Sequence, residues 1–313
     1  MFDATSPPTA SEGRPDLPTP AEPPLLQLIG VSKRFGGLPA VDNLSVAVRR
    51  GEVLGIIGPN GAGKSTLVNL IGGALAPTAG TVLYQGQDIS RLPAHRRAWL
   101  GIARTFQITQ PFAGLDIRDN VLVGALFGGQ RLRRAAAMRM VDDVLERVGL
   151  AHKAALRGDQ LTTADRKRLE LARALATTPR LLLLDEVMAG LTPTEITQAV
   201  ALIREINRTG VTVVVIEHIM RAITGVSDRI LVMHHGRKIA DDEPDRVLSD
   251  PHVIEAYLGE RYAKQRQAQR TGPKAPTDPA AEPLISGPHT GGAGRGDDLI
   301  AMHEDAGGVN DPG

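Results

Sequence analysis

The chain has 313 residues, enough for one large or two small domains, and 42% of them are hydrophobic, which allows a sizeable core. Aromatic residues make up 3% and the formal net charge is +1, a balance that argues against nucleic-acid binding by base stacking or strong electrostatic attraction. Cysteine is absent, which excludes disulfides, thiolate catalysis and cysteine-ligated zinc.

The two ends of the chain differ from its middle in composition. Residues 1–24 are rich in proline and contain no apolar run of the kind found in secretory signals. Residues 263–313 are rich in glycine and proline and lack apolar periodicity. We predict two disordered tails around one ordered domain, residues 25–262. No run of about 18 apolar residues that would span a membrane is present.

The most informative motif is Gly58-Pro-Asn-Gly-Ala-Gly-Lys-Ser-Thr66, which follows the apolar, strand-like run Val53–Ile57. It fits the phosphate-binding pattern G-x-x-x-x-G-K-[ST] between a strand and a helix. Its glycines let backbone N–H groups point at an anion. Lys64 is expected to reach the β- and γ-phosphates, and the Ser65 hydroxyl to ligate Mg²⁺. The predicted nucleotide-binding residues of this loop are Gly58, Pro59, Asn60, Gly61, Ala62, Gly63, Lys64, Ser65 and Thr66.

Residues from about 93 to 165 show few strand-like runs. Ala135–Val148 carries apolar residues at helical spacing along one face. We therefore predict a helical subdomain inserted into the sheet domain. Gln107 lies at the edge of this insert, where its amide is a candidate contact for Mg²⁺ or a water.

The remaining elements alternate between strands and helices. Leu181–Leu184 and Val211–Ile216 are nearly unbroken apolar runs, typical of strands buried on both faces of a parallel sheet. Asp165–Ala176 and Pro193–Asn207 show helical spacing, and Thr192 is a plausible N-cap for the second helix. The pattern predicts an α/β fold.

Ionisable residues follow both apolar strands directly. Asp185 and Glu186 end the first of them, at the edge of a parallel sheet where ligands bind. Asp185 is the candidate for the Mg²⁺ shell, and Glu186 for the base that deprotonates a water aimed at the γ-phosphate. His218 follows the second strand and would place an imidazole near the same phosphate. The alternative is solvated acids and a surface histidine.

Together these residues resemble the ATP-binding subunits of ABC transporters over roughly Leu25–Tyr262. Within that family the chain is similar to the branched-chain (hydrophobic) amino-acid importer ATPases. This second likeness rests on Ser32-Lys-Arg-Phe-Gly-Gly37, Gly101-Ile-Ala-Arg-Thr-Phe-Gln107, Ala189-Gly-Leu191 and Asp250-Pro-His-Val-Ile-Glu-Ala-Tyr-Leu-Gly259. The resemblance implies a P-loop NTPase (RecA-like) sheet core with an N-terminal antiparallel β portion and an inserted helical subdomain.

The resemblance also implies roles for single residues. Phe35 stacks on adenine, although a core aromatic is the alternative. Gln107 is the Q-loop glutamine, Glu186 is the catalytic base and His218 is the switch histidine. The cofactors implied are ATP and Mg²⁺.

The short signature of the family departs from its usual form, L-S-G-G-Q or L-S-Y-G-Q. It is Leu161-Thr-Thr-Ala-Asp165 here. Thr162 keeps a hydroxyl, while Ala164 replaces a glycine; both are expected to face the ATP of a partner subunit. Asp165 places a carboxylate where a neutral amide is usual, and we expect it to repel the partner's polyphosphate. This favours a heterodimer with a second, related ATPase over a homodimer.

The function implied is an ATP-hydrolysing subunit of an ABC importer for branched-chain or other small amino acids. It would drive transmembrane permease subunits from the cytoplasmic face of the inner (plasma) membrane, with a solute-binding protein as an indirect partner. Two alternatives stay open. One is a hydrolysis-poor nucleotide-binding partner that regulates an active ATPase, and the other is the ATPase of a lipopolysaccharide-type exporter.

Overall fold

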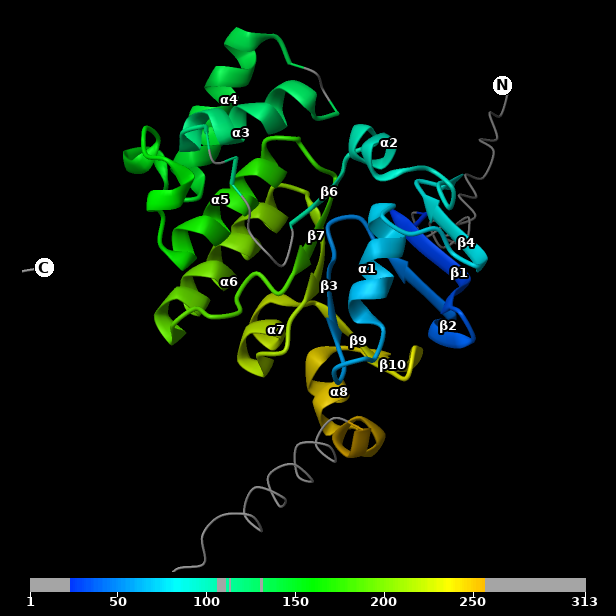
Figure 1. Ribbon diagram of the computed structural model, residues 1–313. Helices are drawn as coiled ribbons and strands as arrows, with labels where there is room; N and C mark the ends of the chain where they lie inside the picture. The colour runs from blue at the N-terminus through cyan, green and yellow to red at the C-terminus, as the bar shows by residue number, and fades with distance from the viewer. Residues whose placement is uncertain (1–22, 106–110, 113, 130–131, 257–313) are drawn as a thin grey trace, which may run out of the picture. The chain divides into compact units, whose positions relative to one another are not determined.

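An antiparallel sheet opens the fold, as predicted. Its four strands follow the order β2-β1-β4-β5. Their bounds are β1 Leu26–Phe35, β2 Leu38–Val48, β4 Ala79–Tyr84 and β5 Gln87–Asp88. The computed structural model shown in Figure 1 describes residues 23–105, 111–112, 114–129 and 132–256, all within the unit Met1–Gln269.

A six-stranded sheet forms the centre, in the order β10-β9-β3-β8-β7-β6. Its strands are β3 Val53–Ile57, β6 Ile102–Arg104, β7 Leu181–Asp185, β8 Thr212–Ile216, β9 Arg229–His234 and β10 Arg237–Asp242. All pairs are parallel except β9 with β10. Every residue of β3, β7 and β8 is buried, which explains why these strands read as continuous apolar runs.

The two faces of the central sheet belong to different hydrophobic cores. Leu181 and Leu183 pack into the core that the central sheet shares with the antiparallel sheet and α1 (Lys64–Gly72). Leu182 and Leu184 point the opposite way, into a core covered by helices. Successive strand residues alternate between faces, so a four-leucine run can fill both cores.

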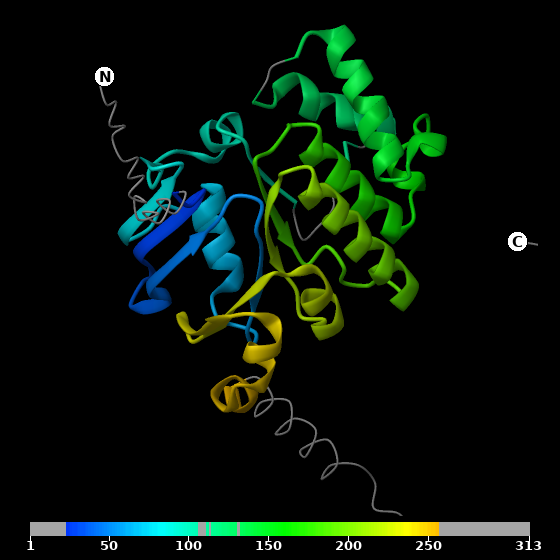
Figure 2. The same ribbon diagram turned by 180° about the vertical axis from the view of Figure 1, so that it is seen from behind.

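Most of the helices cover the second face of the central sheet and extend beyond it, whereas α2 lies beside α1 (Figures 1 and 2). The helices are α2 Ala94–Trp99, α3 Ile117–Phe127, α4 Arg134–Arg147, α5 Thr163–Leu175, α6 Pro193–Arg208, α7 Met220–Val226 and α8 Pro244–Ser249. Helix α3 packs on α4 and α5. The predicted limits of the helical insert, 93–165, stay a prediction, and β6 within that range belongs to the central sheet. Among the described helices, none combines the length and apolar character needed to cross a bilayer.

A buried arginine closes the end of α1. Arg97 is 1% exposed, and its Nη1 donates to the carbonyls of Leu70 and Ile71 at 2.5 and 2.8 Å. These carbonyls lie in the last turn of α1 and have no partner within the helix. Burial lowers the pKa of Arg97 to about 10. The C-cap Gly73 has φ +81°, and a Cβ there would lie 2.7 Å from Arg97 Nε. This contact fixes α2 against α1.

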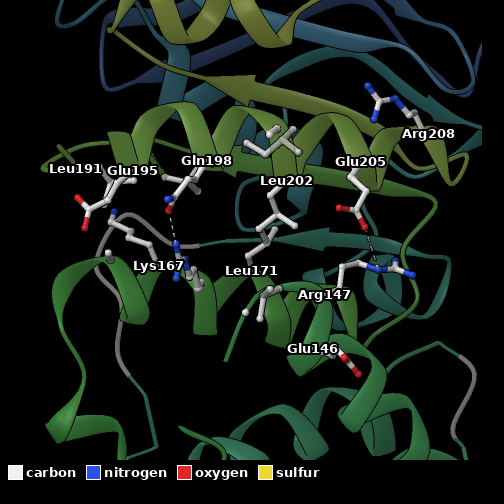
Figure 3. Close-up of a pocket in the computed structure, with 18 residues that line it drawn as sticks. Glu146, Arg147, Lys167, Leu171, Leu191, Glu195, Gln198, Leu202, Glu205 and Arg208 are labelled. Atoms are coloured by element: carbon white, nitrogen blue, oxygen red, sulfur yellow. Dashed lines mark hydrogen bonds and ion pairs between the residues drawn. The ribbon is translucent and has the colours of Figure 1, made fainter. Parts of the chain in front are cut away.

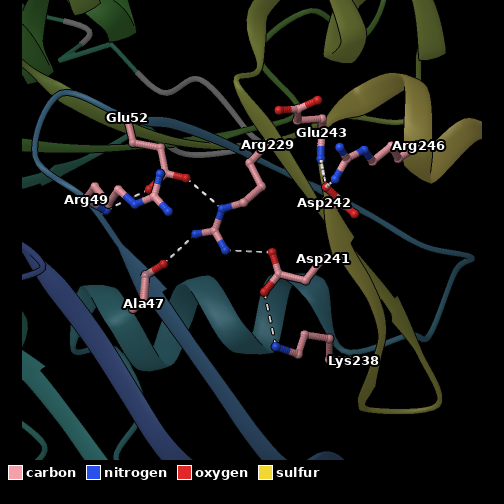
Figure 4. Close-up of polar contacts among 9 residues, drawn as sticks. All are labelled: Ala47, Arg49, Glu52, Arg229, Lys238, Asp241, Asp242, Glu243 and Arg246. Atoms are coloured by element: carbon pink, nitrogen blue, oxygen red, sulfur yellow. Dashed lines mark hydrogen bonds and ion pairs between the residues drawn. The ribbon is translucent and has the colours of Figure 1, made fainter.

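A second arginine joins the two sheets (Figure 4). Arg229 Nε donates to Glu52 Oε1 and its Nη1 to Asp241 Oδ1, both at 2.7 Å, and Nη2 contacts the carbonyl of Ala47. The partners come from β10, from the end of β2 and from the turn before β3. A guanidinium presents its N–H donors in a rigid plane, and this geometry fits acceptors that come from three different segments.

Candidate active site

The loop between β3 and α1 depends on glycine for its shape. Gly58 has φ +154° and Gly63 has φ +98°, and a Cβ on either residue would lie 2.2 Å from a backbone carbonyl oxygen, of Met233 or of Ala40. Gly61 has φ +82°. Only glycine adopts these conformations and permits these approaches without strain. The loop ends at the N-terminus of α1, whose dipole favours an anion.

Lys64 is buried at the base of this loop, 9% exposed. Its Nζ donates to the carbonyls of Gly58 and Pro59 at 2.8 and 3.0 Å. Burial lowers the pKa of the Lys64 ammonium, while the carboxylates of Glu186 and Asp185 act in the opposite direction. The tertiary structure therefore brings the two acids at the end of β7, Asp185 and Glu186, within electrostatic reach of the lysine of the loop.

Asp185 has one oxygen paired and one not. It is 3% exposed, and its Oδ2 accepts from Arg104 Nη2 at 3.0 Å. Its Oδ1 is buried and has no hydrogen-bond partner among the described residues. A buried carboxylate oxygen without a partner is costly, and carboxylate and hydroxyl oxygens are the ligands that Mg²⁺ prefers. Asp185, with Ser65 exposed at the start of α1, thus fits a divalent cation.

Glu186 adopts a conformation that is rare for a side chain of its size, with φ +51°. Its N–H donates to the carbonyl of Ile216 at 3.0 Å, and its own carbonyl accepts from Lys167 Nζ at 3.1 Å. These bonds hold the backbone while the side chain stays partly exposed. Such strain concentrates at functional sites, which supports Glu186 as a reactive group.

His218 is exposed after β8, and the residue before it is one that sequence reasoning missed. Glu217 is 1% exposed, and its Oε1 accepts from the backbone N–H of Met188 at 2.8 Å. Burial raises the pKa of Glu217 to about 7. An acid directly after a strand buried on both faces was the available signal, because such a side chain can hardly reach solvent.

Phe35 ends β1 and is 51% exposed. The alternative of a core aromatic is therefore wrong. Lys33 Nζ lies 5.5 Å from the centroid of its ring. An exposed ring face is what stacking on a planar base requires.

The signature segment is built differently from the expectation. Thr162 is the N-cap of α5; its Oγ1 accepts from the N–H of Asp165 and donates to Asp165 Oδ2 at 2.8 Å. Asp165 is 5% exposed and pairs with Lys153 Nζ at 2.5 Å. Burial acts to raise the pKa of Asp165, but hydrogen bonds from Lys153 and Thr162 outweigh it and lower the pKa. The expectation that Asp165 presents its charge to a partner's nucleotide is wrong, because its own chain neutralises it.

The predicted residues of the signature segment are not brought to this site. Gln107 lies outside the residues that the structure describes. Across the part of the chain that the structure describes, no hydrogen bond joins Thr162 to the phosphate loop. Ala164 instead borders a cavity of about 500 Å³ between α5 and α6, where Arg168 Nη2 donates to Gln198 Oε1 at 2.8 Å (Figure 3). Its lining mixes apolar side chains such as Leu202 with charged ones such as Lys167 and Glu205.

Comparison with known proteins agrees with this geometry. The ABC transporter family matches residues 41–189, and the branched-chain amino acid ATP-binding cassette transporter family matches residues 237–263. The high-affinity branched-chain amino acid transport ATP-binding protein LivG of Salmonella typhi is 39% identical over 251 residues, covering 76% of this chain and 98% of LivG. BraF of Pseudomonas aeruginosa, which has the same description, is 38% identical with the same coverage.

Solved structures agree as well. A nucleotide-free ATP-binding cassette from an ABC transporter superposes with a TM-score of 0.67 at 31% identity, covering 74% of this chain and 98% of that one. An ATP-binding cassette of an ABC transporter in its ADP conformation superposes with a TM-score of 0.68 at 32% sequence identity. The match covers 75% of this chain and 98% of that one. These neighbours confirm the predicted fold class. With LivG similar over nearly its whole length, the chain belongs to the ATP-binding subunits of ABC transporters, in the branched-chain amino-acid family.

Proposed function

We propose that this chain binds MgATP at the loop Gly58–Thr66 and hydrolyses it as the ATPase subunit of an importer for branched-chain or other small amino acids. One observation carries the assignment of the site. The ammonium of Lys64 and the carboxylates of Asp185 and Glu186 lie within electrostatic reach of one another, although more than a hundred residues separate them in sequence.

Each residue then has a distinct task. Lys64 binds the β- and γ-phosphates, and Ser65 and Asp185 hold Mg²⁺. When bound, Mg²⁺ supplies positive charge to the phosphate oxygens. Glu186 takes the proton from the attacking water, and His218 contacts the γ-phosphate from the end of β8. Phe35 stacks on adenine, and Gln107 contacts the metal or the attacking water.

A second ATPase subunit completes the site in this proposal. Thr162 and Ala164 of one chain face the nucleotide of the other. The charge of Asp165 no longer argues for asymmetry, since Lys153 neutralises it. The methyl group of Ala164 still does, because a glycine there lets the backbone approach the phosphate more closely. We therefore retain a heterodimer as the proposed assembly.

The permease subunits dock in a groove beside α1. This cavity of about 380 Å³ is bordered by α2, β6, α3 and α5. Small residues form much of its wall, namely Gly72, Ala74, Ala94, Ala98, Gly124 and Ala174. Their lack of bulk lets the backbone of an incoming helix approach closely, as at helix interfaces generally. We place the subunit at the cytoplasmic face of the inner membrane, with a solute-binding protein acting on the permease from the other side.

Reconstitution tests this function. The chain is combined with the candidate permease subunits, a second ATPase and a solute-binding protein in proteoliposomes, and uptake of labelled leucine is measured. We expect uptake that requires ATP. The names of the relatives favour amino-acid import over lipopolysaccharide export and over a purely regulatory role. Failure of the purified chain to bind ATP would overturn the proposal, and ATP hydrolysis coupled only to an export permease would support the exporter.

A further inference from the structure

One side chain connects three elements around the proposed metal site. Arg104 is the last residue of β6. Its Nη2 lies 3.0 Å from Asp185 Oδ2 at the end of β7, and its Nη1 lies 2.5 Å from Asn69 Oδ1 on α1. The side chain is 16% exposed and that of Asp185 only 4%. The guanidinium presents its N–H donors in a rigid plane, so in this largely buried environment it fixes the positions of both acceptor oxygens.

The same side chain also borders the groove beside α1. Arg104 lines it together with Gly72, Glu170 and Arg173, and a Cβ on Gly72 would lie 3.7 Å from Arg104 Cδ. Glu170 is 6% exposed and Arg173 Nη1 lies 3.5 Å from its Oε1. Arg104 therefore has a carboxylate on its nucleotide side and another carboxylate along the groove.

We propose that Arg104 is a positioning residue that transmits the occupancy of the metal site at Asp185 to the groove in which the permease docks. This inference rests on the proposed function. The guanidinium is held by Asp185 as long as that carboxylate has no other cation. It is repelled once a divalent charge lies beside the same carboxylate, and it then shifts toward the groove, where Glu170 offers a second partner.

Thermodynamic linkage makes the effect reciprocal. If metal binding displaces Arg104, then removing Arg104 must change the affinity for the metal. If metal binding changes the affinity of the groove for a permease segment, that segment must change the metal affinity by the same factor. Metal affinity and the conformation of the groove can both be measured while no ATP is hydrolysed.

The absence of cysteine allows a clean test in the full chain. A fluorophore is attached at Val123→Cys in the groove, and a non-hydrolysable ATP analogue is bound. Mg²⁺ is added to record the probe response, and Mn²⁺ affinity is measured by electron paramagnetic resonance. We expect Arg104→Gln to bind Mn²⁺ about fivefold or more tightly and to lose most of the probe response. The control His95→Gln, in the same groove, should respond like the unmodified chain.

The outcomes separate this inference from the proposed function. Unchanged Mn²⁺ affinity or an unchanged probe response in folded Arg104→Gln overturns the inference, and so does an equal loss in His95→Gln. Failure of the unmodified chain to bind the analogue overturns the proposed function instead. If Arg104→Gln does not fold, Arg104→Lys replaces it. Lysine keeps the charge but does not reach Asp185 and Asn69 together, so a full probe response in Arg104→Lys also overturns the inference.

Discussion

The Glu217 carboxylate accepts a hydrogen bond from the backbone N–H of Met188 at 2.8 Å. This bond joins the end of β8, which carries His218, to the segment that follows Glu186. A second bond, from the N–H of Glu186 to the carbonyl of Ile216, runs in parallel at 3.0 Å. These two bonds hold the segment that carries Glu186 against the segment that carries His218. We therefore expect the two residues proposed to act at the γ-phosphate to move as one unit.

The burial of Glu217 makes stability depend on pH. Its pKa is raised from 4.5 to about 7 in the folded chain, so the folded state holds the proton where the unfolded chain has lost it. Stability therefore falls as the pH rises from 4.5 to 7, by on the order of 3 kcal/mol. Glu217→Gln should be more stable than the unmodified chain at pH 8, with a smaller difference at pH 5, in urea unfolding. The exposed Glu205→Gln is the control, and a difference independent of pH would contradict the prediction.

Lys64 should be required for nucleotide binding. The Lys64→Ala variant removes the point charge that reaches the phosphates, and a charge-assisted hydrogen bond contributes about 1.5–3 kcal/mol. We expect ATP affinity, measured by calorimetry, to fall at least about tenfold while circular dichroism shows a folded chain. Lys238→Ala removes a lysine that pairs with Asp241 on β10 and should bind ATP normally. Unchanged affinity in folded Lys64→Ala would show that ATP binds elsewhere.

Glu186 should be the general base. Glu186→Gln keeps the shape of the side chain and removes its ability to take a proton, which typically costs about 10²–10⁴ in rate. The variant should bind ATP normally and accumulate as a nucleotide-bound dimer in size-exclusion chromatography. Glu195→Gln, a change in the capping box of α6, is the control and should turn over at a nearly normal rate. Normal turnover by Glu186→Gln would assign the water to another residue.

Filling the groove beside α1 should uncouple hydrolysis from transport. Ala98→Trp places an indole among the small residues that line it. We expect basal ATPase activity to stay within about twofold, because none of the described residues assigned to ATP or Mg²⁺ lines this groove. ATP-dependent uptake in proteoliposomes should be lost, because the indole fills the space that the permease needs. Ala201→Trp on the exposed face of α6 is the matched control. Normal uptake by Ala98→Trp would place the permease elsewhere.

Two signature variants should separate activity from stability. Asp165→Asn breaks the ion pair with Lys153 and should cost about 1–3 kcal/mol in unfolding free energy, with little effect on turnover at low temperature.

Ala164→Gly removes the methyl group proposed to face the partner's nucleotide and should raise the ATPase rate of the chain purified alone. Full activity of the lone chain, unchanged by Ala164→Gly or by a second ATPase, would contradict the heterodimer.

Local sequence predicted most of the fold and the centre of the site. The strands at Val53–Ile57, Leu181–Leu184 and Val211–Ile216 were predictable, because a strand buried on both faces has no polar position. The helix at Pro193–Asn207 was predictable from its cap, since Thr192 and Glu195 form a capping box there. The glycine spacing of the phosphate loop reflects a backbone that only glycine adopts, and the family prediction made from these motifs is confirmed.

Tertiary structure decided what depends on residues far apart in the chain. The sequence shows an acidic residue at Asp165 but not that Lys153 neutralises it. It shows Glu217 beside His218 but not the backbone N–H of Met188 that bonds to it. It places Arg104 in a motif without revealing Asp185 as its partner. Charge compensation and burial arise from packing between elements, which no local pattern records, whereas strand burial and loop shape are imposed on the local sequence itself.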